Sequence, residues 1–181
     1  MDEIQTGIGR TGTLFAYEQY DVEPDIMTLA KGLGSGVPIG ALLAKEEVSL
    51  FSPGEHGSTF GGNPLVCAAA YAALKYIIDN GIPRRVKRVG NYFMTKLESL
   101  KQQFDFITEV RGRGLLIALE FNNEIAEELV MACLGKGLLV NAVKPNALRF
   151  MPPLIITERE VDRASQVLEG VLGEQKIKVG G

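Results

Sequence analysis

The sequence has few of the residues that build metal clusters, and it has no long apolar run. Its 181 residues include no tryptophan and one histidine. Because a histidine-containing zinc cluster and a Ser-His-Asp triad would each depend on His56 alone, we expect neither, and no metal site. No apolar run approaches the roughly 20 residues that cross a bilayer, and the first residues lack a signal-peptide pattern. We therefore expect neither membrane insertion nor export.

Cysteine is also scarce. The two cysteines, Cys67 and Cys133, lie far apart in apolar stretches. This pattern is typical of buried thiols in a reducing compartment and not of a disulfide framework. A cytoplasmic location is expected.

No charge of one sign dominates the sequence. The 19 basic and 22 acidic residues give a formal net charge of −3, which argues against nucleic acid as the main partner. A basic run at residues 84–88 lies on an amphipathic helical pattern, where a solvated face is expected. Apolar residues make up 46% of the chain, enough for one domain or two small lobes. The expected partner is a small molecule.

Strand and helix patterns interleave along the chain, which predicts the α/β class. Apolar periodicity and turn residues also predict a change to a smaller α+β lobe after about residue 80. The last predicted helix has a capping box, in which Glu160 follows Thr157 by three residues. The expected strands are 25–30, 39–44, 106–110, 115–121, 138–141 and 147–150, and the expected main helices are 64–80, 83–104, 124–134 and one that starts after Thr157.

The segment Gly7-Ile8-Gly9-Arg10-Thr11-Gly12 has the letters of the dinucleotide motif GxGxxG. That motif binds a dinucleotide only when a strand leads into it and a helix follows it. A polar turn precedes it here. The sequence therefore favours a structural or cofactor-facing loop over a nicotinamide or flavin site.

Two local patterns suit a phosphorylated aldehyde cofactor. Asp2, beside Gln5, offers a carboxylate that keeps a pyridine nitrogen protonated. Lys31 follows an apolar strand and precedes a run of glycines, so we expect a desolvated amine that is neutral and nucleophilic. Taken alone, a lysine in such a context is more often a surface or structural residue.

A third pattern is a glycine-rich loop at residues 57–63. Its hydroxyls, Ser58 and Thr59, and its backbone amides can bind a phosphate. Arg111, between two predicted strand segments, can grip a carboxylate with two hydrogen bonds, although an arginine is more often a simple ion-pair partner.

Four segments together resemble the class III (ornithine-type) aminotransferases, which depend on pyridoxal phosphate (PLP). Within that family the resemblance is strongest to members that act on N-acetylornithine in arginine biosynthesis. The segments are DEIQTGIGRTG at 2–12, PDIMTLAK at 24–31, GSTFGGNP at 57–64 and VRGRGL at 110–115.

The resemblance implies a role for each matching residue. Asp2 pairs with the pyridinium nitrogen and Gln5 bonds near the phenolic oxygen of PLP. Lys31 holds the cofactor as a Schiff base and then moves a proton. Thr59 binds the phosphate on the cofactor of the neighbouring subunit of a homodimer. Arg111 holds the substrate carboxylate.

The resemblance also implies the fold. Residues 1–80 correspond to the C-terminal part of the large PLP-binding domain of a fold type I enzyme, and residues 81–181 to its small α+β domain. Family members carry a long N-terminal half before the equivalent of Asp2, so the chain is expected to be a C-terminal portion that binds PLP weakly by itself.

The implied reaction transfers the terminal amino group of N-acetylornithine to 2-oxoglutarate, so an amino donor and a 2-oxo acid are the expected partners. Two alternatives stay open. One is another class III reaction, on ornithine, 4-aminobutyrate or a succinylated substrate. The other is a folded fragment without catalysis.

Overall fold

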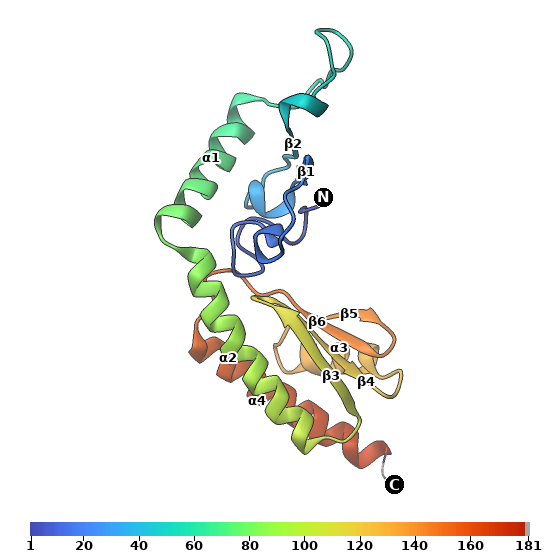
Figure 1. The fold of residues 1–181 in the computed structure, drawn as a ribbon. Coiled ribbons are helices and arrows are strands. Elements are labelled where there is room, and N and C mark those ends of the chain that lie inside the picture. The colour runs from blue at the N-terminus through green and yellow to red at the C-terminus, as the bar shows by residue number, and fades with distance from the viewer. Residues whose placement is uncertain (180–181) are drawn as a thin grey trace. The chain divides into compact units, whose positions relative to one another are not determined.

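The computed structural model describes residues 1–179 and divides into two compact units, Met1–Arg85 and Val86–Gly181 (Figure 1). The first unit contains a two-stranded sheet, short 3-10 helices and the long helix α1, Pro64–Asp79. The second contains a four-stranded sheet with helices α3 and α4 and most of α2, Ile82–Gln103, which begins just before the boundary. The α/β class expected from the sequence is confirmed.

The sheet of the first unit pairs β1, Ile26–Leu29, with β2, Ala41–Ala44, in antiparallel register, so that Leu29 lies opposite Ala41. Met27 and Leu29 point into the small core and are buried. The sequence predicted a buried second strand over 39–44, but β2 is shorter and its residues are half-buried or exposed. The adjacent side chains of Leu42 and Leu43 point to opposite faces and are 64% and 46% exposed, so the described residues of this unit cover neither face of β2.

Helix α1 begins and ends where its capping residues predict. The side chain of Asn63 accepts a hydrogen bond from the Val66 amide at 3.2 Å, and Pro64 occupies the first turn, where its missing N–H costs nothing. Gly81, just beyond the helix, has a φ of +59°, which favours glycine. One sequence expectation fails on this helix: Cys67 is exposed, because it lies on a face of α1 that no described residue covers.

The second unit is built on an antiparallel sheet of order β3-β4-β6-β5. Its strands are β3, Ile107–Arg113; β4, Leu116–Phe121; β5, Asn141–Lys144; and β6, Ala147–Phe150. Helices α3, Ala126–Gly135, and α4, Glu158–Val179, complete the unit, with α3 packed against β5, β6 and α4. The sequence placed β5 about three residues too early and treated residues 111–113 as a link, whereas they belong to β3.

The core of this unit lies along the apolar face of α2 that the sequence predicted. Its residues, spaced three and four apart, are at most 3% exposed. They are Val86, Val89, Phe93, Leu97 and Leu100. A Cβ on Gly90 would lie 2.1 Å from the carbonyl oxygen of Gly114, so only glycine lets the helix approach the β3–β4 turn this closely. Cys133 is buried here, as expected, and burial raises the pKa of its thiol.

The predicted capping box at the start of α4 is confirmed. The Glu160 amide donates to Thr157 Oγ1 at 3.3 Å, and the Thr157 amide donates to Glu160 Oε2 at 2.8 Å. Among residues 1–179, no single helix combines the length and apolarity needed to cross a membrane; α1 and α2 reach that threshold only when they are counted together.

Candidate active site

Lys31 lies at the carboxyl end of β1, two residues beyond the strand, at the start of the 3-10 helix η2, Lys31–Leu33. Its backbone has a φ of +43°, a left-handed conformation that is costly for any residue with a Cβ. Such strain persists only where the surroundings impose it, and it often marks functional sites. The expected desolvation is not found: Lys31 is exposed, because within the described part of its unit nothing covers this end of the strand.

Asp2 lies beside the same strand. It forms an isolated parallel bridge with Thr28, and the amides on either side complete the contact: Glu3 N donates to Thr28 O at 3.0 Å, and Thr28 N donates to Met1 O at 3.0 Å. Its Oδ1 accepts hydrogen bonds from Ile4 N at 2.9 Å and from Thr28 Oγ1 at 3.3 Å. The carboxylate is therefore fixed beside Thr28, which precedes Lys31 by three residues in the sequence.

Gln5 is half-buried in the turns that follow Asp2. The segment continues with Gly7 and Gly9, and its chain reverses by hydrogen bonds from Gly7 N to Glu3 O, 2.9 Å, and from Gly9 N to the Leu14 carbonyl, 3.0 Å. Within residues 1–179 the segment is preceded by the single bridge at Asp2 and followed by a 3-10 helix, η1, Ala16–Gln19. This differs from the strand-loop-helix that a dinucleotide site requires.

The glycine-rich loop ends at the N-terminus of α1. Both hydroxyl residues, Ser58 and Thr59, are exposed, and Ser58 Oγ accepts a hydrogen bond from Gly61 N at 2.9 Å. Asn63 shapes the end of the loop, since its Nδ2 donates to Phe60 O at 2.9 Å while its oxygen caps the helix. Amides at a helix N-terminus favour a phosphate.

A hollow of about 500 Å³ borders this loop. One wall is Gly40, which directly precedes β2. Because Leu29 pairs with Ala41, Gly40 lies at the same end of the hairpin as Lys31. The complete lining is Pro38, Ile39, Gly40, Phe60, Gly61, Gly62, Asn63 and Val66.

These groups fit PLP in their chemistry. A carboxylate and a primary amine flank the end of one strand, and the glycine-rich loop that carries the two hydroxyls and leads into the N-terminus of α1 borders a hollow at that end. They match the ring nitrogen, the aldehyde and the phosphate of the cofactor, respectively.

Arg111 belongs to the second unit, within β3 and opposite Ala118 of β4. Its guanidinium lies 2.5 Å from Glu109 Oε2 and 2.5 Å from Glu120 Oε2. The hydrogen bond with Glu120 raises the pKa of Arg111 and lowers that of Glu120. Both contacts use Nη1, so a substrate carboxylate at Arg111 would meet a guanidinium whose charge two glutamates already neutralise.

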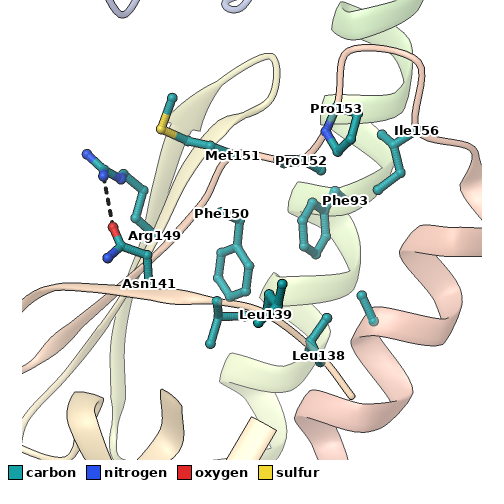
Figure 2. A pocket seen from close by; sticks show the side chains of 12 residues that line it. Phe93, Leu138, Leu139, Asn141, Arg149, Phe150, Met151, Pro152, Pro153 and Ile156 are labelled. Atoms are coloured by element: carbon teal, nitrogen blue, oxygen red, sulfur yellow. Dashed lines mark hydrogen bonds between the residues drawn. The ribbon is translucent and has the colours of Figure 1, made fainter. Parts of the chain in front are cut away.

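The sequence interpretation missed a second arginine in this unit. Arg149 lines a cavity of about 420 Å³ at the end of β6, and its Nη2 donates to the neutral side chain of Asn141 at 2.8 Å (Figure 2). The aromatic rings of Phe93 and Phe150 meet edge to face in the same cavity, with centroids 5.2 Å apart. The available signal was an arginine at the end of a strand, followed by Phe150-Met151-Pro152-Pro153.

Comparison with known proteins places the chain in one family. The family model described as Aminotransferase class-III matches residues 1–172. An acetylornithine aminotransferase of Caldanaerobacter subterraneus subsp. tengcongensis is 55% identical over 174 residues, and one of Methanocaldococcus jannaschii is 49% identical over 178. The two alignments cover 96% and 97% of this chain and 44% of each relative, so the chain spans less than half of the relatives' length.

Solved structures agree. The acetylornithine aminotransferase of Elizabethkingia anophelis has a TM-score of 0.90 at 42% identity, covering 95% of this chain and 44% of that one. The ornithine aminotransferase of Toxoplasma gondii ME49 has a TM-score of 0.92 at 38% identity, covering 98% of this chain and 43% of that one. From its residues, its fold and these relatives, the chain belongs to the class III aminotransferase family.

Proposed function

We propose that the chain supplies the lysine, the pyridine-side carboxylate and a phosphate loop of a PLP-dependent aminotransferase site. The observation that carries this proposal is the placement of Asp2 and Lys31 around the carboxyl end of β1. PLP, when bound, supplies an electron sink that makes the C–H of the carbon bearing the substrate amino group acidic. The chain's own residues hold the reactants and move the proton.

This proposal gives each residue a defined task. Asp2 keeps the ring nitrogen protonated through its carboxylate, and Gln5 donates a hydrogen bond near the phenolic oxygen. Lys31 Nζ first holds the cofactor and then removes the proton from the donor carbon that carries the transferred amino group. Ser58 and Thr59 bind phosphate, with Thr59 reaching the site of a neighbouring subunit in a homodimer.

Two arginines compete for the substrate carboxylate. Arg111 remains the residue that the motif favours, and its ion pairs with Glu109 and Glu120 would exchange for the substrate. Arg149 is the alternative that the geometry favours, because its nearest hydrogen-bond partner given by the structure is a neutral amide and it lines a cavity. A guanidinium that pairs with an amide offers its full charge to an anion, whereas the charge of Arg111 is already neutralised by two carboxylates.

For the substrate, we propose transfer of the terminal amino group of N-acetylornithine to 2-oxoglutarate in the cytoplasm, as a step of arginine biosynthesis. The names of relatives that are 45–55% identical support it. Ornithine is the second candidate, supported by the structural likeness to ornithine aminotransferases at 38% identity.

The test is a titration of the chain with PLP, followed by visible absorption. We expect a band that free PLP lacks, its loss in Lys31→Ala, and its retention in Lys75→Ala, which removes an exposed lysine of the same unit that pairs with Asp79. No band in the intact chain would favour the alternative of a folded fragment without cofactor.

A second arm of the same experiment separates the arginines and the donors. Bleaching of the band by N-acetylornithine but not by ornithine supports the first substrate. The subsequent return of the band with 2-oxoglutarate is compared in Arg111→Gln and Arg149→Gln. The arginine that binds the carboxylate is the one whose loss raises the concentration of 2-oxoglutarate needed, by about tenfold or more for a charged hydrogen-bonded pair.

A further inference from the structure

Directly after Asp2, the first unit buries a carboxylate. Glu3 is 3% exposed. Its Oε1 accepts a hydrogen bond from the Tyr17 amide at 2.9 Å, and its Oε2 accepts one from Thr6 Oγ1 at 2.5 Å. Burial of a carboxylate is unfavourable unless hydrogen bonds of this kind offset it. The side chain thereby joins the turn after Asp2 to the 3-10 helix η1, which lies 14 residues further along the chain.

The backbone of Glu3 makes two more links. Its amide donates to Thr28 O in β1 at 3.0 Å, and its carbonyl oxygen accepts from Gly7 N at 2.9 Å. The second contact is so close that a Cβ at position 7 would lie 2.8 Å from that oxygen. One residue therefore ties together β1, the glycine turn and η1.

The segment that Glu3 holds contacts the proposed cofactor site at two points. At one, Asp2 Oδ1 accepts the Ile4 amide, directly on the other side of Glu3. At the other, buried Ile8 packs over Gly32, where an added Cβ would lie 3.4 Å from the Ile8 Cβ. Gly32 adjoins Lys31. Ile8 itself has a φ of +56°, strained for a β-branched residue, so its surroundings must impose this conformation.

We propose that Glu3 is a positioning residue, which fixes the Asp2 carboxylate and the backbone beside Lys31 before any cofactor binds. The proposal rests on the function proposed above, since it assigns Asp2 and Lys31 to the site. A carboxylate is a poor choice for stability alone, because a well-packed apolar side chain of similar volume stabilises a core equally well or better. What the carboxylate adds is direction: two acceptor oxygens set the orientation of two separate donors.

The test measures amide hydrogen exchange by NMR in the chain without cofactor. In Glu3→Leu, whose apolar side chain has similar volume but no acceptor, the Ile4 amide bound to Asp2 is expected to exchange about tenfold faster or more. The reference is the Lys45 amide, which donates to Asp25 O at 2.9 Å at the other end of the β1–β2 hairpin and is expected to keep its rate. Glu3→Gln keeps an acceptor for Tyr17 and is expected to restore most of the protection at Ile4.

A matched control is Glu18→Gln, which neutralises an exposed carboxylate of the same segment, whose Oε1 accepts from the Phe15 amide. It is expected to leave Ile4 unchanged. If Glu3→Leu does not fold, Thr6→Val removes only the donor to Oε2 and gives the same comparison. An equal rise at Ile4 and Lys45, or no rise at Ile4, would overturn the positioning role. Because the measurement contains no PLP, its failure is distinct from failure of the absorption test.

Discussion

Strain at single residues is concentrated beside the proposed cofactor site. Of the described residues other than glycine, only Ile8, Lys31 and Ser35 have a positive φ. Two of them lie on either side of Gly32: Ile8 packs against this glycine, and Lys31 directly precedes it in the sequence. A left-handed conformation costs about 1–2 kcal/mol for a residue with a Cβ, so each must be held by its surroundings.

Substitutions at Ile8 separate strain from packing. Ile8→Ala removes a side chain that is 2% exposed but keeps the Cβ, and we expect it to lose about 2–5 kcal/mol of the free energy of unfolding. Ile8→Gly loses the same packing and relieves the left-handed strain, which offsets the roughly 0.5–1 kcal/mol entropic cost of glycine. In urea unfolding, Ile8→Gly should therefore be at least as stable as Ile8→Ala. A glycine variant clearly less stable than the alanine variant would show that the backbone at Ile8 is not strained.

At this scale the sequence was informative wherever one short segment carries the chemistry. Asp2, Lys31 and the 57–63 loop were located by their local motifs, and the fold brings Asp2 and Lys31 to one strand end. Arg149 was missed because its setting is non-local: the cavity that it lines takes Phe93 from α2 and Leu138 from a segment 45 residues later. The exposure of Lys31 was also beyond prediction, since it depends on what covers the strand end.

Elements with strong caps and regular periodicity were predicted closely, as α1 and the Thr157–Glu160 capping box show. The end of β3 was predicted wrongly. Residues 111–113 looked like a link because two charges and a glycine interrupt the apolar alternation. In the structure, however, the pairing with β4 continues to Arg113, which lies opposite Leu116. Gly112 allows this, since a Cβ there would lie 2.3 Å from Leu116 O. Cross-strand hydrogen bonds decided the boundary, and these cannot be read from side-chain periodicity.

Helices α2 and α4 run alongside each other and are joined by two carboxylates of α4, Glu158, which pairs with Arg88, and Asp162 (Figure 1). Asp162 Oδ1 accepts a hydrogen bond from Tyr92 Oη at 2.6 Å and pairs with Lys96 Nζ at 2.9 Å. The Tyr92 hydrogen bond, followed by that of Lys96, lowers the pKa of Asp162. Its contribution to stability is therefore present above the unfolded-state value and is lost as the pH falls through the lowered folded-state pKa.

Asp162→Asn tests this pH dependence. At neutral pH we expect the variant to be less stable than the parent chain, because it loses the ionised acceptor. The difference should shrink as the pH falls below about 4, the ordinary pKa of an aspartate, and disappear below the lowered folded-state pKa of Asp162. Thermal unfolding across this pH range measures it, with Glu169→Gln, a carboxylate on the same helix, as the control. A difference between Asp162→Asn and the parent that stays constant with pH would contradict the assigned linkage.

At the scale of the whole molecule, the first unit exposes an unusual amount of apolar surface. Where exposed apolar side chains form a large patch, that surface commonly marks contact with another polypeptide. The chain also spans only 44% of the length of its first relatives. The exposed side chains include Leu42, Leu50, Phe51, Phe60, Leu65, Tyr71 and Tyr76, each between 56% and 84% exposed.

The α1 surface is the part best placed to contact a second copy, since it adjoins the loop whose Thr59 is proposed to reach a neighbouring subunit. Leu65 is 76% exposed and Tyr71 is 70% exposed on this helix. We expect the chain to associate at micromolar concentration in sedimentation velocity experiments, and Leu65→Glu or Tyr71→Glu to shift it towards the monomer, because a charge buried without a partner in an apolar contact is unfavourable. The control is Leu139→Glu, which changes an 83% exposed leucine of the second unit and should leave association unaltered. A parent chain that stays monomeric at these concentrations, or an equal effect of all three substitutions, would rule out α1 as the contact.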